Sequence, residues 1–280
     1  MNSFDRVDKK GLILTIVKYI SVVLLVLLNT IPFFWVIMSS FKNNNEIFAR
    51  PFNLPVKWVF ENYQKAWIRT DIGVAFINSV IATFVSLFLI LLLSAMVAYV
   101  LARVRPNPLI YTVFNIGIMI PAHATLIPLF IILKNLHLVN TRTGLIVVYI
   151  ASSLSLSVFI LVGFMKTIPK EIEESACMDG CPPHRIFFSI ILPIIKPALA
   201  TVATLTFRNN WNDYLFASII NPSPNVATMT KAVFGLRGQY TTEYGLLFAG
   251  ISMAVVPVII MYVVFQEQVI KGAVAGSVKG

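Results

Sequence analysis

Apolar runs long enough to cross a lipid bilayer recur along this chain, and they restrict its fold more than any other feature. A helix of about 20 apolar residues spans the hydrocarbon core, because each residue adds about 1.5 Å of length. Charged residues make up 12% of the chain, whereas soluble domains carry roughly 25%. A transmembrane barrel would show short alternating segments instead of continuous runs. The sequence therefore predicts an all-α membrane protein.

We expect six transmembrane helices in a single domain that covers residues 1–280. The expected spans are about 12–40, 74–102, 109–133, 144–165, 190–220 and 245–269. Prolines fall inside the third, fifth and sixth spans, where neighbouring helices can satisfy the backbone groups that a proline frees. The first run is too long for a secretory signal peptide and lacks a small-residue cleavage site. An even number of spans places both termini on one side of the membrane.

A charged island, residues 169–180, interrupts the apolar pattern between the fourth and fifth spans. Pro169 suits the first turn of a helix, and three glutamates follow where the helix dipole favours acids. Asp179 and Gly180 form a turn pair, and we expect Gly180 to take the left-handed conformation that ends a helix. Two prolines, 182–183, then open a second short helix. The loop 166–189 is thus predicted to form an elbow on the membrane surface.

Two readings of this elbow stay open on physical grounds alone. A short helix that protrudes from a membrane domain can sit in a groove of a soluble partner. An ordinary interfacial loop with well-capped helices explains the same residues equally well. Lys and Arg divide almost evenly between the two sides of the membrane, so charge gives little guidance on orientation. We place the elbow and both termini in the cytoplasm because a soluble docking partner would lie there.

Composition excludes several other classes. The net charge of +10 suits a protein beside anionic lipid, and no basic stripe with interleaved aromatics indicates nucleic acid. Cys177 and Cys181 cannot make a disulfide framework, and no His or Cys pair completes a metal site around them. We expect both to be free thiols. No nucleophile–base pair suggests a membrane enzyme.

The run from Glu174 to Gly180, followed by Leu192-Pro193, resembles the EAA loop of ABC-importer permeases. That loop reads roughly E-A-A, then D-G-A, then an apolar stretch that ends in L-P. This chain departs from it at Ser175, at Cys181 and at the two prolines that follow. Further stretches resemble carbohydrate-importer permeases: residues 32–48, 61–63, 78–79, 138–141, 211–214 and 275–280. The resemblance covers nearly the whole chain and points to the shorter, six-helix "G-type" permease of maltose and multiple-sugar systems.

The resemblance implies a multi-subunit importer in the cytoplasmic (inner) membrane. A second, homologous permease, two ATPase subunits that hold ATP and Mg, and an extracellular or periplasmic solute-binding protein are the implied partners. The cargo would be a carbohydrate, a di- or oligosaccharide. The chain has no G-x-x-x-x-G-K-[ST] sequence, so we expect a transport subunit that is not itself an enzyme and carries no cofactor. The implied ATPase-coupling residues are Glu173, Glu174, Ser175, Ala176, Asp179 and Gly180, and the tail 271–280 resembles tails that reach between the ATPase subunits.

Polar residues inside the fifth span are the candidate substrate path: Asn209, Trp211, Asn212, Asp213 and Tyr214. The amides and the carboxylate could bond sugar hydroxyls, and the aromatic rings could face sugar C–H groups. The alternative is polar glue between helices, with Arg208 paired to Asp213 or extended to the interface. His123 in the third span is expected to be a packed, hydrogen-bonded histidine.

Two other functions remain alternatives at this point. One is a self-contained secondary transporter, which would need coupling carboxylates at the middle of the membrane and an internal repeat. Apart from Glu267 near the end of the sixth span, Asp213 is the only acid in the predicted spans, and no clear repeat is visible. The other is an ABC importer for a different small polar solute, such as a glycerol phosphate ester.

Overall fold

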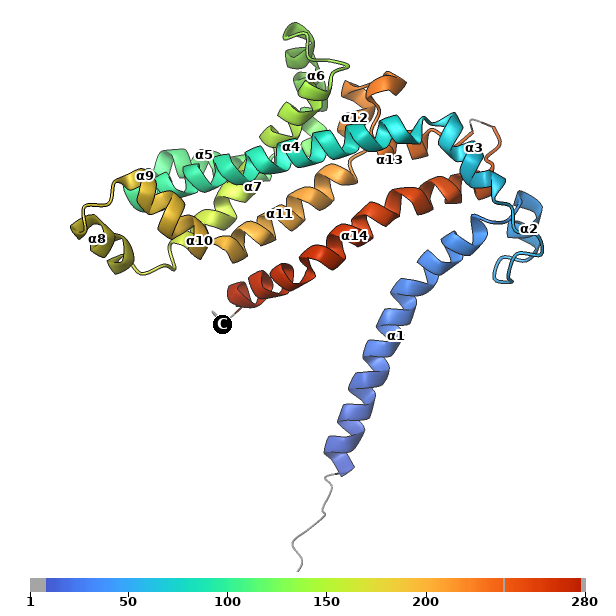
Figure 1. Cartoon of the computed structure of the whole chain (residues 1–280), viewed down its shortest axis with the longest axis horizontal. Helices are drawn as coiled ribbons and strands as arrows, with labels where there is room; N and C mark the ends of the chain where they lie inside the picture. The colour runs from blue at the N-terminus through green and yellow to red at the C-terminus, as the bar shows by residue number, and fades with distance from the viewer. Residues whose placement is uncertain (1–8, 239, 278–280) are drawn as a thin grey trace, which may run out of the picture. The chain divides into compact units, whose positions relative to one another are not determined.

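The computed structural model describes residues 9–238 and 240–277, and all regular elements within these ranges are helical (Figure 1). The α-helices are α1 (Lys9–Ser39), α2 (Asn44–Ala49), α3 (Glu61–Arg69), α4 (Ile72–Tyr99), α5 (Pro108–Met119), α6 (Leu126–Asn135), α7 (Arg142–Met165), α8 (Glu171–Met178), α9 (Pro183–Ile186), α10 (Leu192–Ile194), α11 (Lys196–Trp211), α12 (Leu215–Ile220), α13 (Met229–Phe234) and α14 (Tyr244–Ser277). Two π-helical segments, η1 (Val100–Val104) and η3 (Phe187–Ile191), and two 3₁₀ turns, η2 (Ala122–Thr125) and η4 (Pro224–Val226), complete the elements.

The described residues form two compact units. The first contains residues up to 66 together with residues 236–253, and the second contains residues 67–235 together with those from 254 onward. Helices α1, α2 and most of α3 belong to the first unit, and α4 to α13 belong to the second. Helix α14 contributes residues to both units.

The first unit is organised around the chain that follows α1. The ring of Phe41 packs against the rings of Trp58, Phe60 and Tyr63, with centroids 5.1–5.3 Å apart. Lys42 is fully buried, and its ammonium donates to the carbonyls of Arg50 and Pro51. A buried ammonium needs such acceptors, because an unpaired buried charge is very costly. This turn therefore holds its shape through side-chain bonds to backbone carbonyls.

The second unit is built on three helices that lie side by side, α4, α7 and α11 (Figure 1). Early residues of α4 and α7, such as Ala82 and Leu145, share one apolar cluster, and late residues, such as Ala98 and Leu161, share another. Helices α4 and α7 therefore run in the same direction. Ala198, near the start of α11, belongs to the second cluster, so α11 runs the opposite way.

Three helical segments of the described chain are long and apolar enough to cross a membrane: Leu14–Ser39, Ile72–Val104 and Arg142–Met165. A fourth candidate is a bent pair, Pro183–Ile194 with Lys196–Trp211, whose halves meet at 73°. The remaining apolar helices, Pro108–Met119, Leu126–Asn135 and Tyr244–Ile260, are shorter. These lengths and compositions make the chain a membrane-embedded helical protein.

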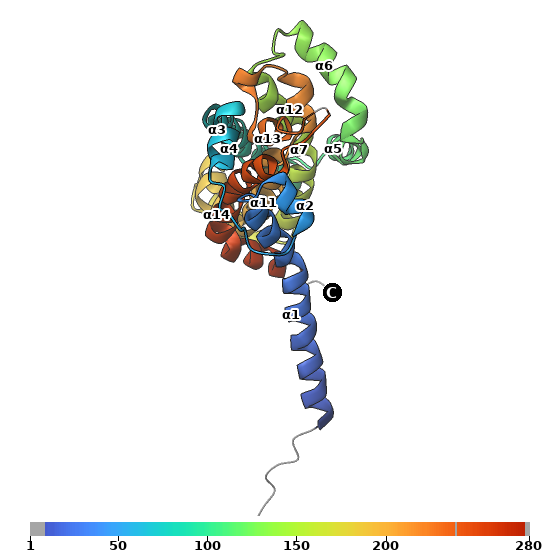
Figure 2. The same cartoon turned by 90° about the vertical axis from the view of Figure 1, so that its right-hand side faces the viewer.

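The third expected span, 109–133, is divided in the structure. Helix α5 ends at Met119, the turn η2 follows Pro121, and α6 then leaves in another direction (Figures 1 and 2). Pro121 has no backbone N–H, and it holds the preceding residue, Ile120, in extended backbone at ψ 119°. The break is therefore a direct consequence of this proline.

The fifth expected span, 190–220, also differs from a single helix. It bends near Ile195, between two prolines at 193 and 197, and α11 ends at Trp211. The carboxylate of Asp213 accepts the backbone N–H groups of Phe216 and Ala217, and this starts the separate helix α12. Such an acceptor at a helix start stabilises the new helix over continuation of the old one.

Candidate functional site

The elbow between α7 and α10 consists of α8, a tight turn and α9. The N–H of Cys181 bonds to the carbonyl of Ala176, and the N–H of Gly180 bonds to the carbonyl of Cys177. This pair of bonds is a Schellman ending, which needs a left-handed residue. Gly180 has φ +76°, so the predicted left-handed turn is confirmed. The N–H of Cys181 is thereby satisfied where the chain reverses towards α9.

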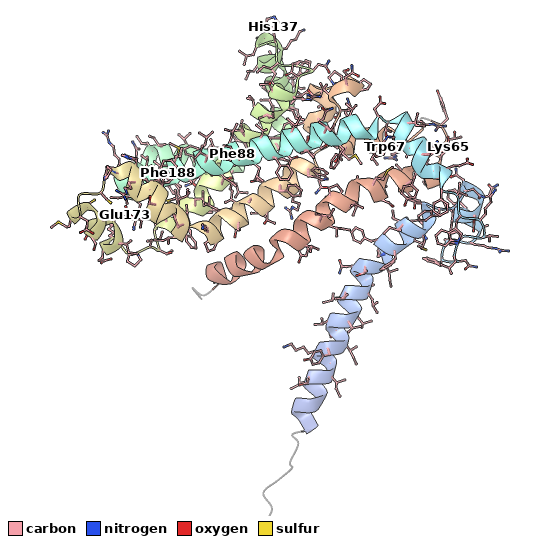
Figure 3. All side chains as sticks on the ribbon, viewed as in Figure 1. Lys65, Trp67, Phe88, His137, Glu173 and Phe188 are labelled. Carbon is pink, nitrogen blue, oxygen red and sulfur yellow. The ribbon has the colours of Figure 1, made fainter. Side chains whose placement is uncertain are left out.

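The six predicted coupling residues divide into two groups. Glu174, Ser175, Asp179 and Gly180 are exposed, and Ser175 donates back to the carbonyl of Glu171. Ala176 is buried in the apolar cluster beneath the elbow. Glu173, labelled in Figure 3, is partly buried. One face of α8 therefore carries exposed polar groups, and the other holds the helix to the membrane domain.

Sequence reasoning missed the two partners of Glu173. The guanidinium Nε of Arg103 lies 2.5 Å from a Glu173 carboxylate oxygen, and the Tyr99 hydroxyl lies 3.4 Å from the other. Both partners come from the end of α4 and the segment η1, about 70 residues earlier in the chain. The only available signal was Arg103 itself, the first charge after a long apolar run.

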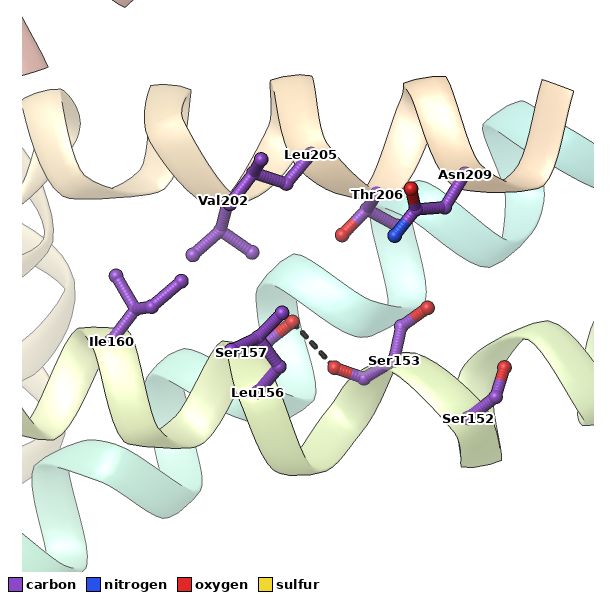
Figure 4. Close-up of a pocket in the computed structure, with 9 residues that line it drawn as sticks. All are labelled: Ser152, Ser153, Leu156, Ser157, Ile160, Val202, Leu205, Thr206 and Asn209. Carbon is purple, nitrogen blue, oxygen red and sulfur yellow. Dashed lines mark hydrogen bonds between the residues drawn. The ribbon is translucent and has the colours of Figure 1, made fainter. Parts of the chain in front are cut away.

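A small polar recess of about 50 Å³ lies between α7 and α11 (Figure 4). Its lining residues are Ser152, Ser153, Leu156, Ser157, Ile160, Val202, Leu205, Thr206 and Asn209. Ser153 and Ser157 stand one helical turn apart, so both hydroxyls reach the same face. Hydroxyls and an amide thus meet in a helical layer that is otherwise apolar. The cluster of serines within 152–157 is the sequence signal that could have predicted this recess.

Of the five residues predicted for the substrate path, only Asn209 lines this recess. Asn212 donates to the carbonyl of Arg208 at the end of α11. Asp213 starts α12, and it also accepts a bond of 3.1 Å from the Tyr149 hydroxyl. The bond to Tyr149 joins Asp213 to another helix, as in the polar-glue alternative, with Tyr149 in the place expected for Arg208. The bond of Asn212 stays within the end of α11.

The two aromatic residues of the predicted path pack against other rings. Trp211 is 3% exposed, and its ring centroid lies 5.7 Å from that of Phe207. The ring of Tyr214 lies 4.1 Å from that of Phe234 in α13. Both rings therefore support helix packing.

Four expectations remain, for the cysteines, a metal site, His123 and the tail. Cys177 and Cys181 are free thiols, as predicted. The searched part of the chain contains no group of three His, Cys, Asp or Glu side chains that could hold a metal ion. The side chain of His123 and residues 278–280 of the expected tail lie outside the described residues, and α14 reaches Ser277.

The fold and its apolar helices define an integral membrane protein of the all-α class. Residues 90–271 match the family of binding-protein-dependent transport system inner membrane components. This match covers more than half of the chain, so the chain belongs to that family.

Curated relatives align over most of their length. The chain is 42% identical over 252 residues to the diacetylchitobiose uptake system permease protein NgcG of Streptomyces coelicolor, covering 89% of this chain and 82% of that protein. It is 35% identical to the probable starch degradation products transport system permease protein AmyC of Thermoanaerobacterium thermosulfurigenes, and 32% identical to the melibiose/raffinose/stachyose import permease protein MelC of Bacillus subtilis. Each of these two alignments covers 89% of this chain and 91% of the relative.

A solved structure has the same fold. One chain in the crystal structure of a bacterial ABC transporter involved in the import of the acidic polysaccharide alginate superposes with a TM-score of 0.78. The match covers 95% of this chain and 99% of that chain, at 22% sequence identity. The helical arrangement described above is therefore a known permease fold.

Proposed function

We propose that this chain is one permease subunit of a binding-protein-dependent ABC importer for a di- or oligosaccharide. The observation that carries the proposal is the alignment of 89% of the chain with relatives named for diacetylchitobiose, starch products and melibiose-type sugars. The polar recess supports it, because a sugar needs partners for its hydroxyls along any path through an apolar layer. The recess is too small for a whole sugar, so it would form one wall of a path shared with a second permease.

The direction of the helices supports a six-span topology. Helices α4 and α7 run the same way and α11 runs the opposite way, as expected for the second, fourth and fifth spans. The broken pair α5–α6 would then form the third span, and α1 and α14 the first and the last. In this topology both termini and the elbow share the cytoplasmic side of the cell membrane.

The elbow would couple this subunit to the ATPase. Its exposed acids, Glu174 and Asp179, offer charges that basic groups of an ATPase cleft can meet. ATP and Mg would be held by two ATPase subunits, and a binding protein would deliver the sugar from the outer side. Closure of the ATPase pair would then bias the membrane domain between two states.

Transport by the reconstituted complex tests this function. The chain is co-purified with its second permease and its ATPase, placed in proteoliposomes, and supplied with binding protein and labelled diacetylchitobiose, maltotriose or raffinose. We expect uptake of at least one saccharide that requires both ATP and the binding protein. Uptake of a glycerol phosphate ester without any saccharide would reject the sugar assignment, and accumulation by this chain alone on an ion gradient would reject the importer.

A further inference from the structure

We propose that Arg103 is a positioning residue that ties the first helix of the elbow to the end of α4 through Glu173. Helices α4 and α8 would then move as one body when the transporter cycles. The inference rests on the proposed coupling role of the elbow, and it adds the route by which motion of the elbow enters the membrane domain. Nothing in the likeness to known permeases assigns Arg103 a role.

Arg103 joins three elements at once. Its Nε contacts the carboxylate of Glu173 on α8, and its Nη2 donates to the carbonyls of Ile168 and Pro169, at 3.0 and 3.1 Å. Those carbonyls belong to the short link between α7 and α8. A planar guanidinium suits this task, because its donors leave in fixed directions. One side chain thus fixes both the start of the elbow and its first helix.

The ion pair is buried enough to matter. The Arg103 side chain is 5% exposed and that of Glu173 is 17% exposed. Exposed ion pairs contribute little, whereas loss of one partner from a buried pair leaves an uncompensated charge. For comparison, the ion pair between Lys65 and Glu61 has side chains that are 52% and 71% exposed. Separation of α8 from α4 would therefore leave the buried Arg103 guanidinium without its counter-charge, which resists independent motion.

Tyr99 connects the carboxylate of Glu173 to the second helical part of the elbow, which begins with α9 and continues into η3. Its hydroxyl donates to Glu173, and its ring packs 5.2 Å from the ring of Phe187. Phe187 begins the π-helical segment η3, and Arg103 lies in the π-helical segment η1. π-Helical segments are rare in proteins overall, and many of those that occur lie at functional sites. Helix α8 and the segment that follows α9 thus both contact the end of α4, through Tyr99 and Arg103.

Neighbouring glutamates on α8 therefore have different tasks. Glu173 is partly buried against Arg103, and Glu174 is exposed. We expect Glu174→Lys to lose the ATPase subunits, because it reverses the charge on the docking face. Glu173→Gln should keep the ATPase subunits bound, because its side chain points into the membrane domain.

The test measures sugar moved per ATP hydrolysed in the reconstituted complex. Arg103→Met and Glu173→Gln are each expected to lower this ratio roughly tenfold, within the range typical of coupling between sites. Both should retain the ATPase subunits in co-purification. Glu171→Gln is the matched control, because Glu171 is exposed on the same helix, and it should behave as wild type. Wild-type coupling in both Arg103→Met and Glu173→Gln would overturn the proposal.

A cross-linking experiment tests whether α4 and α8 move together or whether the contact between Arg103 and Glu173 only stabilises the fold. Cys177 and Cys181 are replaced by serine, and Arg103→Cys with Glu173→Cys is joined by a short bifunctional thiol reagent. If α4 and α8 move together, the cross-link should restore the coupling that the uncross-linked pair has lost. If the cross-linked complex hydrolyses ATP without transport, α8 must move relative to α4 and the proposal is wrong. Failure of sugar uptake in the wild-type complex would instead count against the proposed function.

Discussion

At the scale of single residues, Gly180 shows how one backbone conformation sets the direction of the elbow. Its φ of +76° belongs to the left-handed region, which a Cβ opposes by roughly 1–2 kcal/mol. A Cβ built at this position meets nothing within 4 Å, so the only cost of a larger residue is backbone strain. The turn could be predicted from the sequence because Asp-Gly after a helix is a local signal.

We expect Gly180→Val to misdirect α9 and to reduce co-purification of the ATPase subunits several-fold, with normal insertion into the membrane. Gly163→Val is the control. A Cβ at Gly163 also meets nothing within 4 Å, but this glycine lies within α7, where the helical backbone accepts a side chain without strain. Pull-down of the ATPase by each variant is the measurement. Equal recovery with both variants would mean that the direction of the elbow does not depend on the left-handed turn.

At the scale of elements, the limits of sequence reasoning follow from the range of the interactions. The spans expected at 74–102 and 144–165 lie close to α4 (Ile72–Tyr99) and α7 (Arg142–Met165), because continuous apolar runs are local signals. Asp213, which follows the end of α11, accepts a bond from Tyr149, a residue 64 positions away in another helix. Arg103 and Glu173 are likewise 70 positions apart. Single-sequence patterns carry no information on such pairs.

The break between α11 and α12 leads to opposite predictions for two neighbouring polar residues. Asp213→Ala removes the acceptor for Phe216, Ala217 and the Tyr149 hydroxyl, at about 1–3 kcal/mol for each buried group left unpaired. We expect a lower melting temperature and poorer assembly. Asn209→Ala should assemble normally and weaken sugar transport, because Asn209 faces the polar recess.

Thermal unfolding and uptake, measured side by side, decide this pair of predictions. Asn212→Ala provides a graded comparison, since it loses only one exposed bond to the Arg208 carbonyl. Unchanged stability in Asp213→Ala together with weaker sugar uptake would move Asp213 back into the substrate path. Normal uptake in Asn209→Ala would remove the recess from that path.

At the scale of the whole molecule, many apolar side chains of the described residues are exposed. The segment Leu14–Ser39 has mean hydropathy 2.4, and none of its most apolar window is buried among the residues that the structure describes. Lipid satisfies apolar side chains as well as protein does, so burial alone does not drive helix association in a bilayer. In the proposed complex, the second permease would supply close packing and polar contacts for part of this surface.

We therefore expect the purified chain alone to be poorly stable and to carry out no transport. Co-expression with the second permease should raise its melting temperature and give a single assembled species in size-exclusion chromatography with light scattering. The physical reason is mass action, because a partner that binds only the folded state stabilises that state, and the stabilisation grows with the logarithm of the partner's concentration relative to its Kd. The matched control is the second permease expressed alone, which should show the same loss. A lone chain that is as stable as the complex and accumulates sugar on an ion gradient would contradict both the pairing and the importer mechanism.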